Sequence, residues 1–406
     1  MKTEHVITTV STEEVSSHPR ETGHWSQNWR RNTFRAVKNR WQSGKSSCNP
    51  VEQVENHKKY ATTGVGNKPN GKSQHKRFMN ASELISQTNI VEHDLTKGFP
   101  YTALVHEELQ HYSQIEITDE LTEGGIHAHK SWRFYFEYLQ MNEFGTSFVE
   151  EVVAAVHQKK NPLLLSLGCG YGGLDLAIAR RLQKPYQIFG VDLNPMIFSH
   201  AHRRAMLEGL EIVYLPIDLN FVELQPGSFD VIYAHASLHH LLNLEHVFAQ
   251  IARALTPDGL FVLVDIIGKT QVLFWRQNVE FTAELIKDMP WRFRPPVRRL
   301  WRHFWFDPYT IISKYSEPAV QHGMEGIRQE EIEPVMMKIF EPVKLYKYNA
   351  FMRLICTNRY LGARLNPEKL RDREYLEKLI KIEVEQIKSG KLKPTEMFGV
   401  FKPKSA

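Results

Sequence analysis

The sequence predicts an α/β protein whose sheet is mostly parallel and carries helices on both faces. Between residues 163 and 267, short apolar runs alternate with segments of helical period. Such alternation is typical of parallel strands joined by crossover helices. The runs are continuously apolar, as expected for strands that are buried on both faces. A glycine-rich turn follows the first run directly.

Each element follows from the same patterns, taken in chain order. An aromatic helix over Trp132–Leu139 and a second helix over Phe148–Val156 precede the sheet. The alternating region then predicts the strands Leu163–Leu167, Gln187–Asp192, Glu211–Pro216, Asp230–Ala234 and Leu260–Ile266. The helices between them are predicted at Leu174–Leu182, Pro195–Glu208 and Leu244–Ala254. The closing elements are a strand at Val343–Tyr348, an amphipathic helix at Pro367–Lys388 and a strand at Glu396–Phe401.

Composition divides the chain into five segments. Residues 1–80 are rich in polar residues without a sustained period, so they are predicted to be a basic, mostly disordered tail. Residues 81–157 are predicted to be a helical N-terminal cap, and residues 158–268 are predicted to be the core, whose glycine-rich turn makes it the candidate ligand-binding segment. An insertion dense in aromatic residues and arginines, residues 269–335, is predicted to be a helical lid. Residues 336–406 complete the sheet.

The basic character of the chain is confined to its first segment. The net charge is +5 over 406 residues. Residues 1–80 hold 14 Lys and Arg against 6 Asp and Glu, and the remainder holds 37 against 40. Within the tail, Trp25–Trp41 interleaves aromatic residues with cations and is compatible with a helix on an anionic surface or with a solvated tail. Because the excess charge lies outside the core, a nucleic-acid partner is not expected.

Cysteine usage and hydropathy indicate a cytoplasmic protein. The three cysteines, Cys48, Cys169 and Cys356, are widely spaced and form no C-x-x-C pair. This argues against both a disulfide framework and a structural zinc site. The longest apolar run, Leu260–Val264, is far shorter than the roughly 20 residues that span a bilayer, so no transmembrane segment is predicted.

The glycine turn and a later carboxylate predict a nucleoside site. Gly168-Cys-Gly170-Tyr-Gly172-Gly173 follows the first strand, and Asp192 ends the second. Glycines allow a sharp turn whose backbone amides approach a ligand, and the carboxylate can accept hydrogen bonds from ribose hydroxyls. The run also satisfies G-x-G-x-x-G, so a nicotinamide dinucleotide is the alternative ligand.

The residues further along the chain favour another cofactor. Over roughly Ser147–Gly268 and again at the C-terminal strand, the sequence resembles the class I S-adenosylmethionine-dependent methyltransferases. This resemblance implies a Rossmann-like fold with a seven-stranded sheet and S-adenosyl-L-methionine as the cofactor. The implied cofactor-binding residues are Ser166, Gly168, Cys169, Gly170 and Gly172 at the methionine end, Asp192 at the ribose, Leu193, Asp218 and Leu219 at the adenine, and His235 at the exit of the fourth strand. Ser166 departs from the family, which often has an acidic residue there.

The resemblance also implies the activity, which is transfer of a methyl group to an O, N or C acceptor on a small molecule. His239 and His240 follow the fourth strand, and either could remove a proton from a hydroxyl acceptor. The alternative is that each histidine only packs beside the cofactor. Nucleobase amines are not expected as acceptors, because the exit reads Ala236-Ser-Leu-His. An NAD(P)-dependent oxidoreductase and a non-catalytic scaffold with bound cofactor remain alternatives.

The acceptor itself is not encoded in any motif. The arginines of the insertion suit an anionic acceptor or one tethered to a carrier, but they are equally compatible with a lid whose cations face water. Glu107 and Glu108 with His111, or His127 with His129, lack a convincing set of metal ligands, so no metal is expected. The oligomeric state is left open.

Overall fold

The computed structural model describes residues 80–88, 101–113, 129–294, 312, 323–358 and 360–405. The chain separates into two compact units, residues 1–73 and 74–406, and every described residue belongs to the second unit. The predicted tail at residues 1–79, His127 and much of the predicted lid lie outside the described residues.

A seven-stranded sheet forms the centre of the second unit, and its strand order is β4-β3-β2-β6-β7-β9-β8. The parallel part runs from β4 to β7, and β9 is antiparallel to both of its neighbours. The strands are β2 (Leu163–Leu167), β3 (Gln187–Asp192), β4 (Ile212–Pro216), β6 (Phe229–His235), β7 (Leu255–Ile266), β8 (Phe340–Tyr348) and β9 (Glu396–Pro403). The predicted mostly parallel sheet with a closing C-terminal strand is therefore confirmed.

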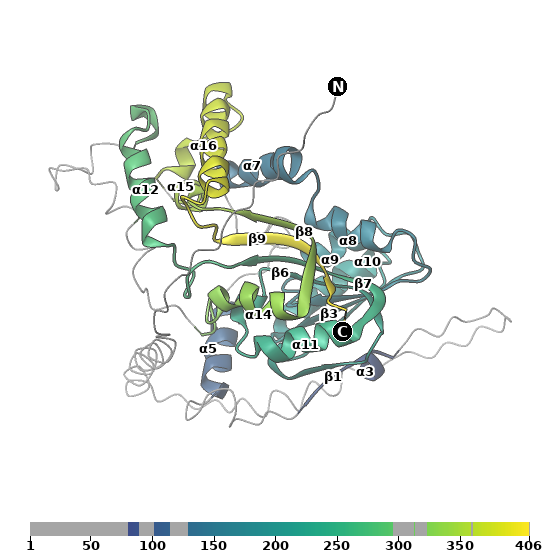
Figure 1. Ribbon diagram of the computed structural model, residues 1–406. Coiled ribbons are helices and arrows are strands. Elements are labelled where there is room, and N and C mark those ends of the chain that lie inside the picture. Colours follow the sequence, from purple (N-terminus) through teal and green to yellow (C-terminus); the bar gives the residue numbers. More distant parts are fainter. Residues whose placement is uncertain are drawn as a thin grey trace, which may run out of the picture. The chain divides into compact units, whose positions relative to one another are not determined.

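Helices cover both faces of this sheet, as predicted. Figure 1 shows α8 (Phe148–Val156), α9 (Gly173–Ala179) and α10 (Phe198–Leu207) on one face, with α11 (Leu244–Ala254) and α14 (Ile332–Ile339) on the other. Each face has its own hydrophobic cluster: Val152 and Leu176 belong to the first, and Val247 and Met336 to the second. The buried strands thus have apolar contacts on both sides, which explains their continuous hydrophobicity.

Helix α8 begins where its sequence predicts. The Ser147 side chain accepts from the backbone N–H of Glu150, whose carboxylate accepts in return from the Ser147 N–H, which is a complete capping box. The chain between β3 and α10 forms the 3-10 turn η2 (Pro195–Ile197), which Asn194 caps. Both caps depend on residues that are close together in the sequence, and they set where the chain turns into α8 and toward α10.

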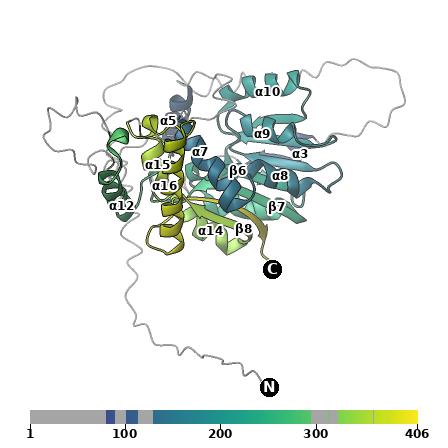
Figure 2. The same ribbon diagram turned by 90° about the horizontal axis from the view of Figure 1, so that it is seen from above.

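The aromatic helix α7 (Lys130–Leu139) packs against the C-terminal part of the chain. Its Trp132 and Tyr135 are buried, and the Tyr135 hydroxyl donates to Glu383 Oε2 at 2.6 Å. Glu383 lies on α16 (Leu370–Lys388), and its other oxygen accepts the backbone N–H groups that begin α15 (Met352–Cys356). These aromatic residues belong to the hydrophobic core, and Figure 2 shows α7 beside α15 and α16.

Several elements were not predicted from the sequence. The short strand β1 (Ile85–Gln87) pairs with β5 (Val222–Leu224) in a separate two-stranded sheet. Further helices were predicted for residues 81–157 and 269–335 without bounds, and the structure has α3 (Ala81–Leu84) and α5 (Tyr101–Ser113) in the first range and α12 (Arg276–Lys287) in the second. The π-helix η1 (Gln140–Phe144) was not predicted. Short 3-10 turns occur at η3 (Leu219–Phe221), η4 (Leu238–His240), η5 (Trp291–Phe293), η8 (Gln329–Glu331) and η9 (Gly362–Arg364). Among the described residues, no helix combines the length and hydrophobicity needed to cross a membrane.

Helix α12 lies in the described part of the predicted lid. The arginines that follow it have partners within the chain. Arg292 lies over the ring of Phe293, 4.3 Å from its centroid, and 3.9 Å from Asp372. Arg294 donates to the backbone carbonyls of Met289 and Lys287. These two cations therefore stabilise the insertion itself, and the remaining arginines of the set, from Arg298 to Arg302, lie outside the described residues.

Candidate active site at the carboxyl edge of the sheet

The glycine turn joins β2 to α9 and has a backbone that favours glycine. Gly168, Gly170 and Gly172 have φ angles of 66°, 51° and 73°, a region that side chains disfavour. A Cβ at Gly168 would lie 2.4 Å from Cβ of Ser237, and one at Gly172 would lie 2.5 Å from the Tyr214 hydroxyl. Gly168 and Gly172 are therefore required both by conformation and by close packing.

Asp192 holds this turn from the end of β3. One carboxylate oxygen accepts from the backbone N–H of Gly170 at 2.9 Å, and the other accepts from the N–H of Asn194 at 3.0 Å. Burial raises the pKa of Asp192, against the opposing effect of these two hydrogen bonds. A carboxylate oxygen can accept more than one hydrogen bond, so Asp192 keeps acceptor capacity for ribose hydroxyls. Its role at the ribose stays a prediction.

Beneath the turn, a second carboxylate occupies the region where Ser166 departs from the family pattern. Asp175 is buried on the first turn of α9, and its Oδ1 accepts from the Tyr233 hydroxyl at 2.8 Å. Burial raises the pKa of Asp175 to about 7, against opposing hydrogen bonds from Tyr233 and Ser166. Within the described part of the chain, Asp175 Oδ2 and the Tyr214 hydroxyl are buried without a hydrogen-bond partner. Buried polar atoms without partners are typical of binding sites.

Asp218 lies at the same edge but is engaged in a protein network. It is buried after β4, where its Oδ2 accepts from the Tyr101 hydroxyl of α5 at 2.8 Å. Its Oδ1 accepts from the backbone and side-chain amides of Asn220. Burial raises the pKa of Asp218, against the opposing hydrogen bonds. The network ties α5 to the sheet, and the contact of Asp218 with adenine stays a prediction.

The other residues that were predicted to contact the cofactor also lie along this edge of the sheet. Leu193 is half-buried directly after Asp192, and Leu219 is buried in η3. Cys169 lies within the turn, where its N–H donates to the Val191 carbonyl at 3.0 Å. His235 ends β6 and packs edge-on against the ring of Phe148, with ring centroids 5.1 Å apart.

The two predicted histidines lie together in η4 and belong to a larger set of polar side chains. We call Glu108, His239, His240, Asp265 and Glu325 the histidine–carboxylate cluster. His239 is buried, and its Nδ1 lies 2.6 Å from Oδ1 of Asp265 on β7. Burial would lower the pKa of His239, but the contacts with Asp265 and Glu325 outweigh it and raise the pKa to about 10.

His240 and Glu325 complete the cluster. His240 Nδ1 lies 2.7 Å from Glu108 Oε1, at an angle that makes this an ion-pair contact and not a well-directed hydrogen bond. Glu325 lies 3.5 Å from His239 Nε2 and 3.3 Å from His240 Nε2. Burial would raise the pKa of Glu325, but His239, His240 and the more distant Arg353 lower it to about 2.

The cluster lies beside the glycine turn, because Ser237 donates both to the Leu167 carbonyl at 2.7 Å and to Asp265 at 3.2 Å. The charges of His240 and Glu108 act on Asp192, the first lowering its pKa and the second raising it. Tyr112 of α5 has its pKa raised by burial, by Glu108 and Glu325, and by Asp192. All of these groups extend from the carboxyl ends of parallel strands or from segments packed over them, which is where open α/β sheets bind ligands.

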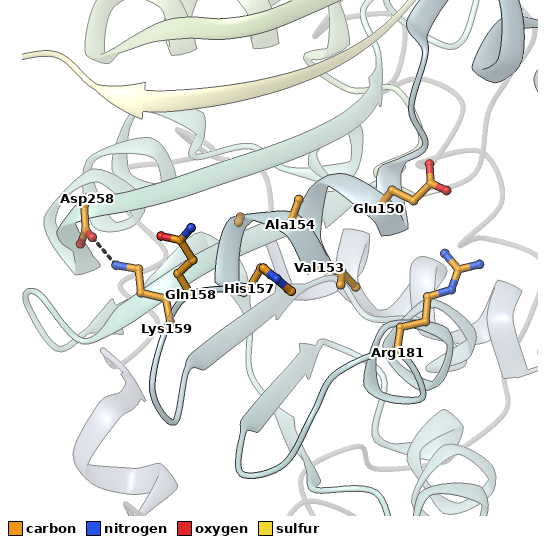
Figure 3. A pocket seen from close by; sticks show the side chains of 9 residues that line it. Glu150, Val153, Ala154, His157, Gln158, Lys159, Arg181 and Asp258 are labelled. Carbon is orange, nitrogen blue, oxygen red and sulfur yellow. Dashed lines mark hydrogen bonds and ion pairs between the residues drawn. The ribbon is translucent and has the colours of Figure 1, made fainter.

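A separate pocket opens at the opposite edge of the sheet. It has a volume of about 680 Å³. Figure 3 shows side chains from the end of α8, from Arg181 and from Asp258, with Lys159 bonded to Asp258. The residues around it are Glu150, Val153, Ala154, Ala155, His157, Gln158, Lys159, Arg181 and Asp258. Lys159 also lies 3.4 Å from Asp230 at the start of β6. The pocket is thus at the amino ends of the strands and is distinct from the predicted cofactor site.

Sequence reasoning missed four of the side chains that shape the site. Asp265 could have been found from the sequence, because it is a single acidic residue at the end of an apolar strand. Glu108 was considered, but with His111 as its partner and not with His240. Glu325 and Tyr101 reach the site only through the fold, because 85 residues separate Glu325 from His240 and α5 has no recognisable motif.

The fold is that of a Rossmann-like protein, and its glycine turn and Asp192 form a candidate nucleoside site at the carboxyl edge of the sheet. The family described as "Methyltransferase domain" matches residues 165–263. This range contains the glycine turn, Asp192, Asp218 and both histidines of η4. The chain is a class I S-adenosylmethionine-dependent methyltransferase, and S-adenosyl-L-methionine is its cofactor. The nicotinamide alternative is therefore not retained.

Known relatives cover different shares of the chain. The 27-O-demethylrifamycin SV methyltransferase of Amycolatopsis mediterranei is 24% identical over 248 residues, which are 58% of this chain and 88% of that protein. The sterol 4-C-methyltransferase strm-1 of Caenorhabditis elegans is 27% identical over 203 residues, which are 47% of this chain and 59% of that protein. The crystal structure of the PH0226 protein from Pyrococcus horikoshii OT3 aligns over 73% of this chain and 99% of its own, with 14% identity and a TM-score of 0.37.

Proposed function

We propose that the chain transfers the methyl group of S-adenosyl-L-methionine to a hydroxyl oxygen of a small molecule. The single observation that carries this proposal is the histidine–carboxylate cluster beside the cofactor turn. A sulfonium methyl donor is already activated, so the protein mainly supplies positioning and a suitable electrostatic setting. Transfer to an amine that carries a lone pair needs no base. A hydroxyl acceptor, in contrast, must lose its proton, and the cluster offers proton acceptors at that position.

Within the cluster, His239 and His240 remain the candidate groups that accept this proton. Asp265 orients His239 through Nδ1, which leaves Nε2 directed toward Glu325. His240 is the more exposed of the two and is the one whose charge acts on Asp192. We therefore assign His240 to the acceptor side and His239 to the support of the cluster.

The relatives support a small-molecule acceptor but differ in the atom that is methylated. One is named for a 27-O position and another for a sterol 4-C position. A sterol carbon must also lose a proton overall, so a C acceptor is the second candidate. The described arginines of the insertion already have partners within the chain, so they give no support for an anionic or carrier-tethered acceptor.

The test is an activity search with the intact chain. The protein is incubated with methyl-labelled S-adenosyl-L-methionine and fractions of a metabolite extract, and labelled products are identified by mass spectrometry and NMR. We expect an O-methyl product that His240→Asn forms at least tenfold more slowly, as is typical when a general base is lost. A labelled amine would contradict the hydroxyl assignment. Cofactor binding without any labelled product would favour the scaffold alternative.

A further inference from the structure

We infer that His239, His240 and Glu325 form a binding site for one divalent first-row transition-metal cation. The sequence predicts no metal here, because Glu325 is far from the histidines along the chain. The fold brings the three side chains together, so that one donor atom from each lies within 4.8 Å of the others. Binding of the cation can be tested without knowing the acceptor. A role of the cation in the reaction, in contrast, rests on the proposed function.

The distances within the triad suit coordination better than direct hydrogen bonding. The Nε2 atoms of His239 and His240 lie 3.5 and 3.3 Å from the two oxygens of Glu325. A charge-assisted N–H···O hydrogen bond is shorter, at about 2.7–2.9 Å. Ligands about 2.0–2.2 Å from a tetrahedral ion, in contrast, are separated from each other by roughly 3.4 Å. The carboxylate oxygens are thus spaced from the imidazoles as they would be around a shared cation.

Both imidazoles are held from behind by carboxylates. The Nδ1 atom of His239 lies 2.6 Å from Asp265, and that of His240 lies 2.7 Å from Glu108. A carboxylate at one ring nitrogen keeps the proton there and leaves the other nitrogen as a ligand. Metal-binding histidines almost always have such partners. His239 has this hydrogen-bonded partner in Asp265, and Glu108 makes an ion-pair contact with the corresponding nitrogen of His240. A carboxylate behind each ring is therefore an independent indication of a metal site.

Backbone hydrogen bonds on both sides of Glu325 hold the segment that carries it. The N–H of Ile327 donates to the His239 carbonyl at 3.1 Å, and the N–H of Met324 donates to Glu108 Oε2 at 3.0 Å. The segment that carries Glu325 is thus tied to η4 on one side and to α5 on the other. The triad is a built site, because hydrogen bonds outside it hold its members in position.

The charges of the cluster also favour a cation. Three carboxylates, Glu108, Asp265 and Glu325, surround two imidazoles, so the carboxylates outnumber the imidazoles and the cluster is anionic whether the rings are neutral or protonated. Buried charges are costly unless they are compensated. Arg353 acts on Glu325 but is itself 3.2 Å from Glu396. A divalent cation would compensate most of the remaining charge.

Two imidazoles and one carboxylate with open positions suit Zn²⁺ or Fe²⁺ better than Mg²⁺ or Ca²⁺, which prefer oxygen ligands. An oxygen of the acceptor could occupy an open position. A bound cation lowers the pKa of a hydroxyl that it contacts. The cation would then provide the activation that the proposed function assigns to a histidine.

The experiment measures metal binding by the full chain after treatment with a chelator. Zn²⁺ binding is titrated by calorimetry, and Co²⁺ binding is followed through its visible absorption. The test variants are His240→Asn and Glu325→Gln. The matched controls are His246→Asn on α11 and Glu331→Gln in η8, both outside the cluster. Binding of S-adenosylhomocysteine is measured on each sample and reports whether the cofactor site is intact.

We expect the wild-type chain to bind one ion and to give the intense Co²⁺ spectrum of a site with fewer than six ligands. Each test variant should lower the Zn²⁺ affinity by at least about tenfold, while the controls retain it. Absence of Zn²⁺ and Co²⁺ binding by the wild-type chain overturns the inference, even where the cofactor binds. Equal binding by test variants that still bind the cofactor also overturns it, because the ion would lie elsewhere.

Discussion

Asp192 shows how one side chain can shape a turn and also prepare it for a ligand. Its two oxygens accept backbone N–H groups from Gly170 and Asn194, so it orders both the glycine turn and the start of the following loop. Ribose hydroxyls would add to an arrangement that already exists. Such a preorganised carboxylate loses little entropy when the ligand binds.

Replacement of this carboxylate should weaken cofactor binding without unfolding the protein. For Asp192→Ala, we expect a loss of about 1.5–3 kcal/mol in binding, which is roughly ten- to a hundredfold in affinity. Calorimetric titration with S-adenosylhomocysteine measures this change. Asp258→Asn, at the opposite edge of the sheet, is the control and should bind as the wild type does. Unchanged affinity in Asp192→Ala would mean that the ribose lies elsewhere.

Asp175 is a buried acid whose charge state depends on the fold. Burial raises its pKa from 3.8 to about 7. The folded protein therefore binds a proton that the unfolded chain has released between these two pH values. This contribution to stability is complete below about pH 4 and is lost as the pH rises through about 7.

Asp175→Asn should remove that pH dependence. We expect the variant to gain stability relative to the wild type between pH 5 and pH 8, on the order of 2–4 kcal/mol. Urea unfolding at both pH values measures the difference in free energy of unfolding. Asp230→Asn, a more exposed carboxylate, provides the comparison. If the wild type instead gained stability relative to Asp175→Asn between pH 5 and pH 8, the raised pKa of Asp175 would be contradicted.

At the scale of elements, the glycine turn is a close contact between β2 and the chain that leaves β6. Gly168 approaches Ser237, whose hydroxyl donates to the Leu167 carbonyl at 2.7 Å. The backbone N–H of Ser237 donates in turn to Asp265. The cofactor turn and the histidines of η4 are thus joined by a few short contacts.

A comparison of Gly168 with Gly170 distinguishes the cost of an unfavourable backbone conformation from the cost of a steric overlap. Gly168 and Gly170 both have a positive φ, but a Cβ at Gly170 would meet nothing within 4 Å. Gly170→Ala should therefore cost only about 1 kcal/mol of stability. Gly168→Ala should cost about 1–3 kcal/mol more, because the added carbon overlaps Ser237. Thermal unfolding of the two variants gives the comparison, and equal losses would show that this contact relaxes freely.

On the scale of the whole molecule, the site depends on segments that are distant in sequence. Helix α5 contributes Glu108 and Tyr112, β7 contributes Asp265, and the residues after Gly323 contribute Glu325. The C-terminal strand β9 completes the sheet beside β7. The cluster therefore depends on long-range packing between α5, η4, β7 and the segment that carries Glu325.

The first unit should be dispensable for cofactor binding. All of the described site residues lie after Asn80, at the carboxyl edge of the sheet or in segments packed over it. A chain that begins at Asn80 should bind S-adenosylhomocysteine with an affinity within about threefold of the full chain, since its core is complete. Calorimetry on the two chains tests this expectation. A lost signal in the shorter chain, with its fold retained by circular dichroism, would refute it.

Much of the fold was predictable, because its signals are local. The limits of β2, β3 and α11 agree with those predicted, since continuous apolar runs and helical periodicity report burial directly. The strands β1 and β5 were missed because each has only three residues.

The sequence by itself determined the parallel sheet, the glycine turn and Asp192, because these depend on residues that are close together along the chain. Only the tertiary structure decided that Asp218 bonds to Tyr101, that α7 packs on α16, and that Glu325 faces both histidines. Contacts of this kind join positions that are far apart in the sequence, so no local pattern specifies them. The glycine turn and the residues that follow it along the chain indicate the methyl donor, whereas the groups of the histidine–carboxylate cluster are brought together only by folding.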